Sequence, residues 1–544
     1  WSVVVIKSTY NGKDRQTHAN LIDRDTVKLL LDICYEPHWE HYQKEFGKTI
    51  MGFFSDEPQM GNCGGSSLPG IAQMGNDKMP LSWCAQLKEA WGPLFLQVLV
   101  ACWYDVPQFS PAARLSYMDH VSRLFQENFS QQVGDWCRAH GVEYIGHIIE
   151  DNGSHARLGH GRGQDMSGVD VVLQQIRPGL EDTPFYRIDG VDVYNGEMFH
   201  NILAKMGSSL GQIDPKKKGR TMCEIFGAYG WSEGLKLMKW LTDHMLVRGI
   251  NYFVPHAFTM AQFPDPDCPP HFYARGNNPQ YPYFKYVMNY MNRVSHLTNG
   301  GRSVPCVALL YSAEGEWMDY TQSQPLEKVA LTLNRSQIDY EIVPEDVLCT
   351  CPAENGTFQV GQETLKALVI SGRAYVTQRV EAWCEEAAAA GVSIFYIDQQ
   401  PAVVRPGAVG QAVMPEHPVG EKIELAELTG KLKALGLHEI SCDTPEPYLR
   451  YYHYRQNDGD MILFFNEDPH NSIDTWVQVP LTGELSWYDA FDNVLRRAEL
   501  QDGKVHLRLT PYQGLILCQH QGEYAAEMPE NPRQIAEPEE WSLT

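Results

Sequence analysis

Short apolar runs alternate with amphipathic stretches along the first 300 residues. The runs predict strands at residues 49–54, 143–149, 169–176, 220–226 and 251–255. Apolar residues at three- and four-residue spacing predict helices between them, at residues 24–46, 82–91, 111–140 and 232–248. A helix between consecutive strands is typical of parallel βα units. The pattern therefore predicts an α/β fold, namely a (β/α) barrel, with a doubly wound sheet as the alternative.

Two further patterns follow the first. A loop rich in Pro, Asn and Asp at residues 261–282 precedes a second series of alternating strands and helices at 304–420. This series predicts a small flavodoxin-like α/β domain, and it lacks the glycine-rich loop of a nucleotide site. From residue 440 to 520 apolar residues recur at every second position, with turn residues between the runs. That period predicts a small antiparallel β-domain.

We therefore predict four parts of the chain. They are a (β/α) barrel at 1–300, a flavodoxin-like domain at 301–425, a β-domain at 426–520 and an acidic tail at 521–544.

The charge of the chain narrows its possible partners. The 544 residues include 68 acidic and 44 basic side chains, a net charge of −24. Nucleic acids and anionic membranes are poor partners for such a surface. No apolar run is long enough to cross a bilayer, and no signal peptide is visible, so we expect a cytoplasmic protein. The 13 cysteines show no CxxC spacing, which favours reduced thiols.

Acidic residues stand where predicted strands end. Asp56 and Glu57 close the run 49–54, with a proline directly after them. Glu224 is the lone acid in the apolar strand 220–226, where burial is costly unless the acid is paired or functional. Cleavage of a glycosidic bond requires two carboxyl groups, one as acid and one as nucleophile or base. Asp56 could instead be a helix cap, and Glu224 a satisfied core acid.

A third strand end and two aromatic positions complete the candidate pocket. The run 143–149 contains His147 and ends in Glu150 and Asp151. These acids could hold substrate hydroxyls or bind calcium, which prefers oxygen ligands. Trp231 could stack on a sugar, and His256 ends the strand 251–255, although both could simply be packed. Aromatic residues make up 11% of the chain, which suits a sugar cleft as well as a core.

These segments resemble known glycosidases. Residues 220–260 (RTMCEIFGAYGWSEG…INYFVPHAFTM) resemble the seventh and eighth strands of β-galactosidases of glycoside hydrolase family 42. They are more similar still to the α-L-rhamnosidase-like proteins grouped around family 106, as are GFFSDEP at 52–58 and MSGVDV at 166–171. The α/β unit that follows resembles the glutaminase-like domain of family 42, and the terminal β-domain fits as well.

The resemblance implies roles and a strand count. It implies Glu57 as general acid/base, with Asp56 in place of the family's Asn, and Glu224 as nucleophile. It implies a (β/α)8 barrel in which 49–54 is strand four, so strands one to three are expected upstream, or else a closed barrel has fewer strands. Family 42 is retaining and needs no metal, whereas family 106 is associated with inversion and calcium. A homo-oligomer is a further implication.

The main hypothesis is an exo-acting glycoside hydrolase that removes a terminal rhamnose- or galactose-like sugar. Glu57 and Glu224 would be catalytic, and Asp56, His147, Glu150, Asp151, Trp231 and His256 would line the pocket. The cofactor is either none or Ca²⁺ held by Glu150 and Asp151. The alternative is a non-catalytic carbohydrate-binding or scaffold protein derived from a glycosidase. An amidotransferase is disfavoured because Ser371, Gly372 and Arg373 at the expected nucleophile turn include no Cys.

Overall fold

The computed structural model describes the chain in twelve segments. They are residues 3–7, 19–56, 58, 81–106, 109–147, 159–180, 185–186, 193–194, 196–405, 413–414, 417–457 and 459–519.

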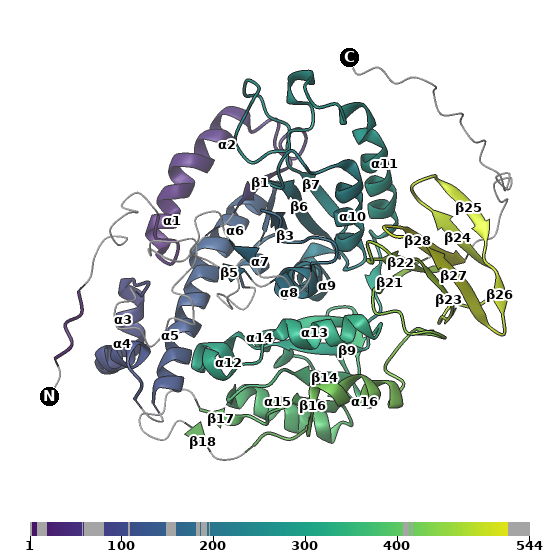
Figure 1. Ribbon diagram of the computed structural model, residues 1–544. Coiled ribbons are helices and arrows are strands. Elements are labelled where there is room, and N and C mark those ends of the chain that lie inside the picture. Colours follow the sequence, from purple (N-terminus) through teal and green to yellow (C-terminus); the bar gives the residue numbers. More distant parts are fainter. Residues whose placement is uncertain are drawn as a thin grey trace.

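The first sheet is parallel and curls into half of a barrel (Figure 1). Its five strands, in spatial order, are β1 (Gly52–Ser55), β2 (Glu143–His147), β3 (Met166–Val172), β6 (Thr221–Gly227) and β7 (Tyr252–Pro255). All five predicted strands are thus confirmed, with shifts of a few residues at their ends. Within the described residues β1 and β7 are edges, so neither the full barrel nor a smaller closed one is formed there.

Helices α6 (Gln132–Ala139), α7 (Gly159–Gly163), α9 (Ala204–Ile213) and α10 (Leu235–Leu246) pack directly on the strands of this sheet. The other helices of this region are α1 (Arg24–Leu30), α2 (Glu36–Tyr42), α3 (Ala85–Trp91), α4 (Phe95–Trp103), α5 (Ser110–Leu124), α8 (Gly196–Met198) and α11 (Tyr281–Leu297). Helices α3 and α4 pack on α5. The predicted helices 24–46 and 111–140 are each interrupted by a π-helical turn, at Leu31–Tyr35 and Phe125–Gln131. A small hairpin, β4 (Phe185–Tyr186) with β5 (Val193–Tyr194), lies apart from the sheet.

Helix α9 was not predicted, and it is buried along its whole length. It packs against β3 and β6 on one side and against a strand of the second sheet on the other. Gly207 and Gly211 make this close packing possible. A Cβ at Gly207 would lie 3.1 Å from the Val169 side chain, and one at Gly211 would lie 2.3 Å from the Thr221 hydroxyl.

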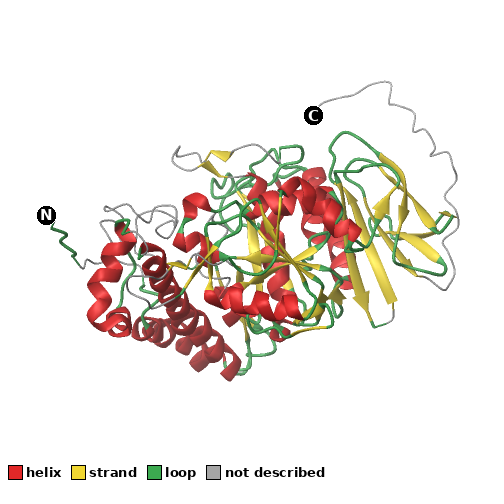
Figure 2. Cartoon of the chain, turned by 90° about the horizontal axis from the view of Figure 1, so that it is seen from below, coloured by secondary structure: helices red, strands yellow, loops and turns green. Residues whose placement is uncertain are grey.

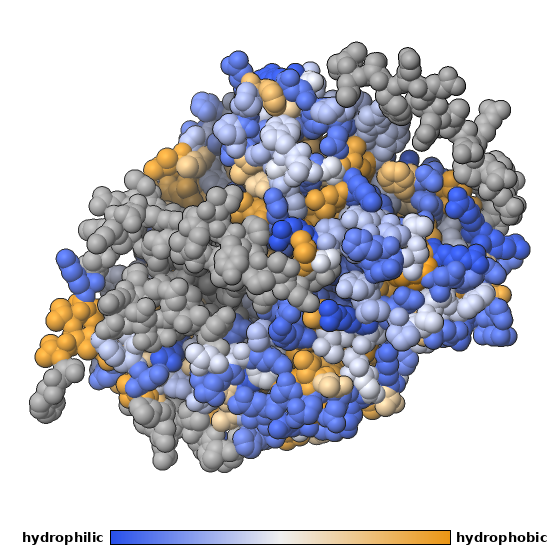
Figure 3. Space-filling view, viewed as in Figure 1, coloured by the Kyte–Doolittle hydropathy of each residue, from blue (hydrophilic) through white to orange (hydrophobic). Residues whose placement is uncertain are grey.

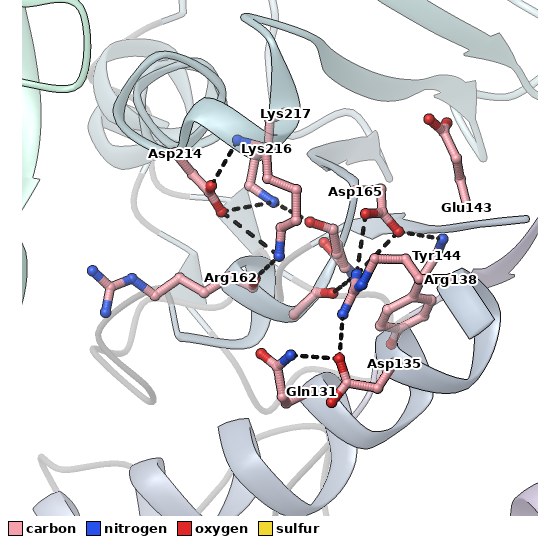
Figure 4. Close-up of polar contacts among 12 residues, drawn as sticks. Gln131, Asp135, Arg138, Glu143, Tyr144, Arg162, Asp165, Asp214, Lys216 and Lys217 are labelled. Carbon is pink, nitrogen blue, oxygen red and sulfur yellow. Dashed lines mark hydrogen bonds and ion pairs between the residues drawn. The ribbon is translucent and has the colours of Figure 1, made fainter. Parts of the chain in front are cut away.

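A polar cluster closes the sheet at the end where its strands begin (Figure 4). The Arg138 guanidinium pairs with Asp165 at 3.0 Å, and the Asp165 carboxylate accepts from the Tyr144 backbone N–H at 2.9 Å. The fully buried Lys217 ammonium donates to the carbonyl oxygens of Gly161 and Gln164 at 2.5 and 2.6 Å. Burial lowers the pKa of Lys217 to about 7. These bonds fix the strand starts, and with them the register that places the strand ends.

The second sheet has the strand order 2-1-3-4-5 of flavodoxin-like folds. Its parallel strands are β10 (Tyr340–Pro344), β9 (Val307–Tyr311), β14 (Ala367–Ile370), β16 (Ser393–Ile397) and β19 (Glu421–Ile423). The helices of this region are α12 (Ala313–Met318), α13 (Leu326–Arg335), α14 (Glu345–Leu348), α15 (Gln378–Ala389) and α16 (Leu428–Ala434). Two small sheets flank them, made of β11 (Ala353–Glu354), β12 (Thr357–Val360) and β13 (Glu363–Leu365), and of β15 (Tyr375–Thr377), β17 (Ala402–Val404) and β18 (Val413–Met414).

The C-terminal region is built of antiparallel strands and loops, as Figure 2 shows. One sheet contains β20 (Ser441–Cys442), β23 (Ile473–Gln478), β27 (Lys504–Leu509) and β26 (Leu500–Gln501). The other contains β25 (Val494–Arg497), β24 (Leu485–Asp489), β28 (Gly514–Gln519), β22 (Gly459–Asn466), β21 (Leu449–Gln456) and β8 (Arg302–Ser303). The structure thus has an α/β fold with antiparallel sheets, whereas the domain boundaries stay predictions.

One buried carboxylate ties the first sheet's helices to the β-domain. Glu467, which follows β22, forms an ion pair with Arg248 and lies beside His244, each at 2.7 Å, while its second oxygen pairs with the Arg450 guanidinium at 2.7 Å. All four side chains are buried. Burial alone would raise the pKa of Glu467, but the two guanidiniums hold it well below its ordinary value.

The surface fits the acidic composition. The described part of the face in Figure 3 is mostly hydrophilic, with smaller apolar patches. Among the described residues, every helix is too short or too polar to cross a membrane. The cysteines of this part of the chain are free thiols.

We predict that Glu467→Gln lowers the free energy of unfolding by about 3–5 kcal/mol, because it leaves two buried guanidiniums without their counter-charge. Urea unfolding followed by circular dichroism measures the change. The control is Glu484→Gln, which removes an exposed ion pair with Arg497 and should cost less than about 1 kcal/mol. Equal, small losses in both variants would show that the buried network does not hold the β-domain in place.

Candidate active site

Polar side chains gather on the face of the half-barrel that the helices leave open. Paired residues of neighbouring strands share a face, and the register places Phe54, His147, Asp170, Glu224 and Val254 on this one. Phe54 and Val254 are exposed there, and the rings of Phe54 and His147 are in contact. The polar members stand toward the carboxyl ends of their strands, the end that holds active sites in βα barrels.

Asp56, His147 and Glu224 meet in one cluster. Nε2 of His147 lies 3.0 Å from Oδ1 of Asp56 and 3.4 Å from Oε2 of Glu224. The imidazole is completely buried, Glu224 is mostly buried, and Asp56 is largely exposed. One ring nitrogen therefore stands between two carboxylates.

The cluster sets the charge state of Asp56. Its hydrogen bond with His147 lowers the pKa of Asp56 below the ordinary value, although partial burial acts to raise it. The charges of His147 and His256 lower this pKa further. Asp56 is therefore an ionised group at neutral pH, suited to accept hydrogen bonds or to stabilise positive charge.

Asp170 is a site residue to which the sequence reasoning gave no role. It is buried on β3, directly beside Glu224 in the register of β3 and β6. The signal that singled out Glu224, one acid inside an apolar strand, is present here too, in MSGVDVV. The two adjacent carboxylates extend the acidic surface across three strands.

His256 and Trp231 stand at the rim. The backbone N–H of His256 donates to the Ile225 carbonyl at 2.9 Å, which holds the residue beside the end of β6. Nδ1 of His256 is buried and, within the described residues, has no hydrogen-bond partner. Trp231 follows β6 in a loop, is 44% exposed, and makes edge contacts with Phe263 and His271. Its free face is available to a ligand.

Three of the predicted site residues lie outside the described residues. They are Glu57, Glu150 and Asp151. Their roles, and the distance between the carboxyl groups of Glu57 and Glu224, stay predictions.

The described cluster could hold a cation, but it is a poor match for calcium. The ligand atoms of Asp56, His147 and Glu224 lie within 4.8 Å of one another. Calcium takes six to eight oxygen ligands, whereas this set includes an imidazole nitrogen, which suits zinc and other transition metals better. We therefore derive no catalytic step through calcium from these three residues.

Comparisons with known proteins yield matches of fold. No protein-family model matches the sequence, and no relative is found among curated proteins. A rhamnosidase from Novosphingobium sp. PP1Y aligns with a TM-score of 0.65 and 13% identity, over 94% of this chain and 49% of its own. A β-galactosidase from the Antarctic haloarchaeon Halorubrum lacusprofundi aligns with a TM-score of 0.53 and 11% identity, over 91% and 83%. A catalytic mutant of a GH42 β-galactosidase from G. stearothermophilus aligns at 0.50 and 10%, over 80% and 73%.

The resemblance expected from the sequence is thus confirmed at the level of the fold. This chain shares its architecture with a rhamnosidase and with β-galactosidases, the two groups to which its motifs point. It spans about half the length of the rhamnosidase.

Glu233 is a buried acid next to the rim, and its titration should make the stability of the protein depend on pH. Glu233 is 3% exposed, and neither of its carboxylate oxygens has a hydrogen-bond partner among the described residues. Burial raises the pKa of Glu233 from 4.5 to about 9. The folded chain therefore binds one more proton than the unfolded chain between these pH values. Stability should fall as the pH rises from 4.5 to 9, by at most about 1.4 kcal/mol per pH unit.

We predict that Glu233→Gln removes this part of the pH dependence. The variant should match the parent protein near pH 4.5 and exceed its unfolding free energy increasingly toward pH 9. Urea unfolding at several pH values measures the difference. Glu40→Gln, at an exposed position on α2, should leave the profile unchanged. Parallel profiles of the parent and Glu233→Gln would contradict the assignment.

Proposed function

We propose that this protein is a glycoside hydrolase that removes a terminal sugar with two carboxyl groups. The observation that carries the proposal is the cluster of Asp56, His147 and Glu224 on the open face of the half-barrel, at the carboxyl ends of its strands. Solved glycosidases share this fold, although the identities of 10–13% concern the architecture alone.

Glu224 is the proposed nucleophile or base. It stands on a central strand with β3 and β7 on either side, so its backbone is held firmly. Nε2 of His147 lies 3.4 Å from Oε2 of Glu224. In this role Glu224 either attacks the anomeric carbon or takes a proton from the attacking water. In both cases Asp56 stays ionised nearby and can stabilise the positive charge that develops on the sugar ring.

Glu57 is the proposed general acid. It directly follows Asp56 and thus belongs to the same strand end in the sequence. Protonation of the leaving oxygen by Glu57 would complete the pair. A carboxyl separation of about 5–5.5 Å from Glu224 would lead to retention, and about 6.5–9.5 Å to inversion. Glu150, Asp151, Trp231 and His256 are the proposed contacts to sugar hydroxyls and rings.

The names of the structurally similar proteins suggest which terminal sugar the substrate carries. A rhamnosidase and β-galactosidases share the fold, so a rhamnose- or galactose-like terminal residue is the proposed substrate. Release from the chain end, in an exo mode, is part of the proposal. The non-catalytic alternative, sugar binding without hydrolysis, is an outcome of the tests that follow.

We predict that the chain hydrolyses p-nitrophenyl α-L-rhamnoside or β-D-galactoside and that Glu224→Gln lowers kcat/KM by about 10²–10⁴-fold. The reason is that an amide neither attacks the anomeric carbon nor accepts a proton. Glu40→Gln, at an exposed position on α2 away from the sheet, is the control and should keep its activity. Assays with and without chelator test the metal. Full activity in Glu224→Gln would refute the role, and sugar binding without any hydrolysis would support the alternative.

Glu57→Gln should slow two substrates to different extents, because their leaving groups differ in how much protonation they need. p-Nitrophenolate leaves without much protonation, whereas a sugar alcohol needs the acid. We therefore expect a small loss of kcat/KM on the aryl glycoside and a loss of kcat/KM of about 10²-fold or more on the matching disaccharide. Release of p-nitrophenol and of free sugar measures the two rates. Equal losses on both substrates would show that Glu57 is not the general acid.

A further inference from the structure

A second cleft lies away from the candidate active site. It has a volume of about 900 Å³ and is bounded by the first half of α10, by α11 from Tyr283 to Arg293, and by two segments of the β-domain, at residues 489–492 and 510–514. Figure 1 shows α10 and α11 next to β24 and β28. The volume is in the range of small-molecule sites, which often form where two domains meet. None of the candidate catalytic residues lines it.

Three aromatic rings at this cleft are exposed. Tyr283 and Tyr286 stand three residues apart on α11, so they are neighbours on one helix face, and they are 60% and 52% exposed. Phe491 lines the same cleft from the β-domain and is 45% exposed. These rings contribute little to the core. Flat, exposed rings of this kind suit the apolar C–H face of a sugar.

Polar groups of both signs stand among the rings. Lys236 lies over the Tyr512 ring at 4.4 Å and has no carboxylate partner within the described residues. Asn289 is exposed and its amide makes no hydrogen bond in this part of the chain. Asp489 and Asp492 supply acceptor oxygens. Donors and acceptors in near balance fit a ligand rich in hydroxyl groups better than a phosphate or a strongly charged chain.

The walls of the cleft are already fixed. Lys239 pairs with Asp243 at 2.5 Å and donates to the Tyr512 carbonyl at 2.8 Å, which links α10 to the β-domain. Arg293 of α11 donates to the Ala490 carbonyl at 2.9 Å. A cleft whose walls are bonded to each other requires little ordering when it binds a ligand.

The position of the cleft relates it to the active site. Helix α10 follows β6 through the loop that carries Trp231, and α11 follows the loop after β7. Both helices therefore start at the end of the sheet where Glu224 and His147 stand. A glycan chain held in the cleft would be kept close to that end.

We propose that this cleft is a second carbohydrate-binding site, which holds part of a glycan chain outside the catalytic pocket. The choice of a glycan as ligand rests on the proposed glycosidase function. Tyr283, Tyr286 and Phe491 form the stacking surface, and Lys236, Asn289 and Asp492 bind hydroxyl groups.

Affinity gel electrophoresis tests the proposal, with β-1,4-galactan and rhamnogalacturonan as the immobilised probes. The Glu224→Gln chain serves as background, so the probe is not consumed and catalysis is not needed. We expect one of the two polysaccharides to retard it. Tyr286→Ala and Tyr283→Ala should each weaken that binding by about tenfold, which corresponds to about 1.4 kcal/mol. Tyr42→Ala, which removes a similarly exposed ring on α2, is the matched control and should change nothing.

Two further measurements separate this proposal from others. In the otherwise unaltered chain, Tyr286→Ala should leave kcat/KM on an aryl glycoside unchanged, because so small a substrate does not reach the cleft. If Glu224→Gln loses aryl-glycoside hydrolysis and Tyr286→Ala does not, the loss concerns the active site and not the cleft. The proposal is overturned if neither polysaccharide retards the chain, if retardation disappears in 0.5 M salt as in simple ion exchange, or if Tyr286→Ala changes the oligomeric state instead.

Discussion

A single buried charge, the carboxylate of Glu467, holds the outer parts of this molecule together. Two guanidiniums and an imidazole surround it. The imidazole comes from α10, one guanidinium from Arg248 just after that helix, and the other from β21 of the β-domain. Because these charges are buried, the parts are fixed relative to one another only if all members are in place. Helix α10 in turn forms one wall of the aromatic cleft and is linked directly to the strand that bears Glu224. The geometry of both sites therefore depends on this network.

Much of the fold could be predicted because the β-strands are short, apolar and regularly separated by helices. One site prediction rested on the rule that an acid inside an apolar strand is costly to bury without a purpose, and that rule led to Glu224. Asp56 and Glu57 were predicted from their place at the end of a strand, and in the structure the ligand atoms of Asp56 and Glu224 meet at His147. The same rule applied to Asp170, but a strand interior does not reveal which of its faces is open. Only the register with β6 shows that Asp170 and Glu224 are neighbours.

Other features of the structure could not be predicted from the sequence. Helix α9 is buried on all sides and includes two Gly and two Ser among its ten residues, so its helix propensity is low. Glu467 follows a strand just as a solvent-exposed turn acid would, and its partners lie 17 to 223 residues away along the chain. The aromatic cleft joins residues of α10 and α11 to loops near positions 490 and 512. Such contacts arise from the packing of the domains and not from local pattern.

Helix α9 also determines which motions remain open to the molecule. Its glycines leave no gap toward β3 and β6, and its Lys205 pairs with Asp339 at 3.0 Å and with Glu341 of β10 at 3.4 Å on the other side. A hinge between the two parallel sheets would have to separate these buried charges, so the contacts of α9 oppose that motion. The long loop at residues 256–280 stands outside these contacts, and its Phe263 and His271 touch Trp231 at the rim.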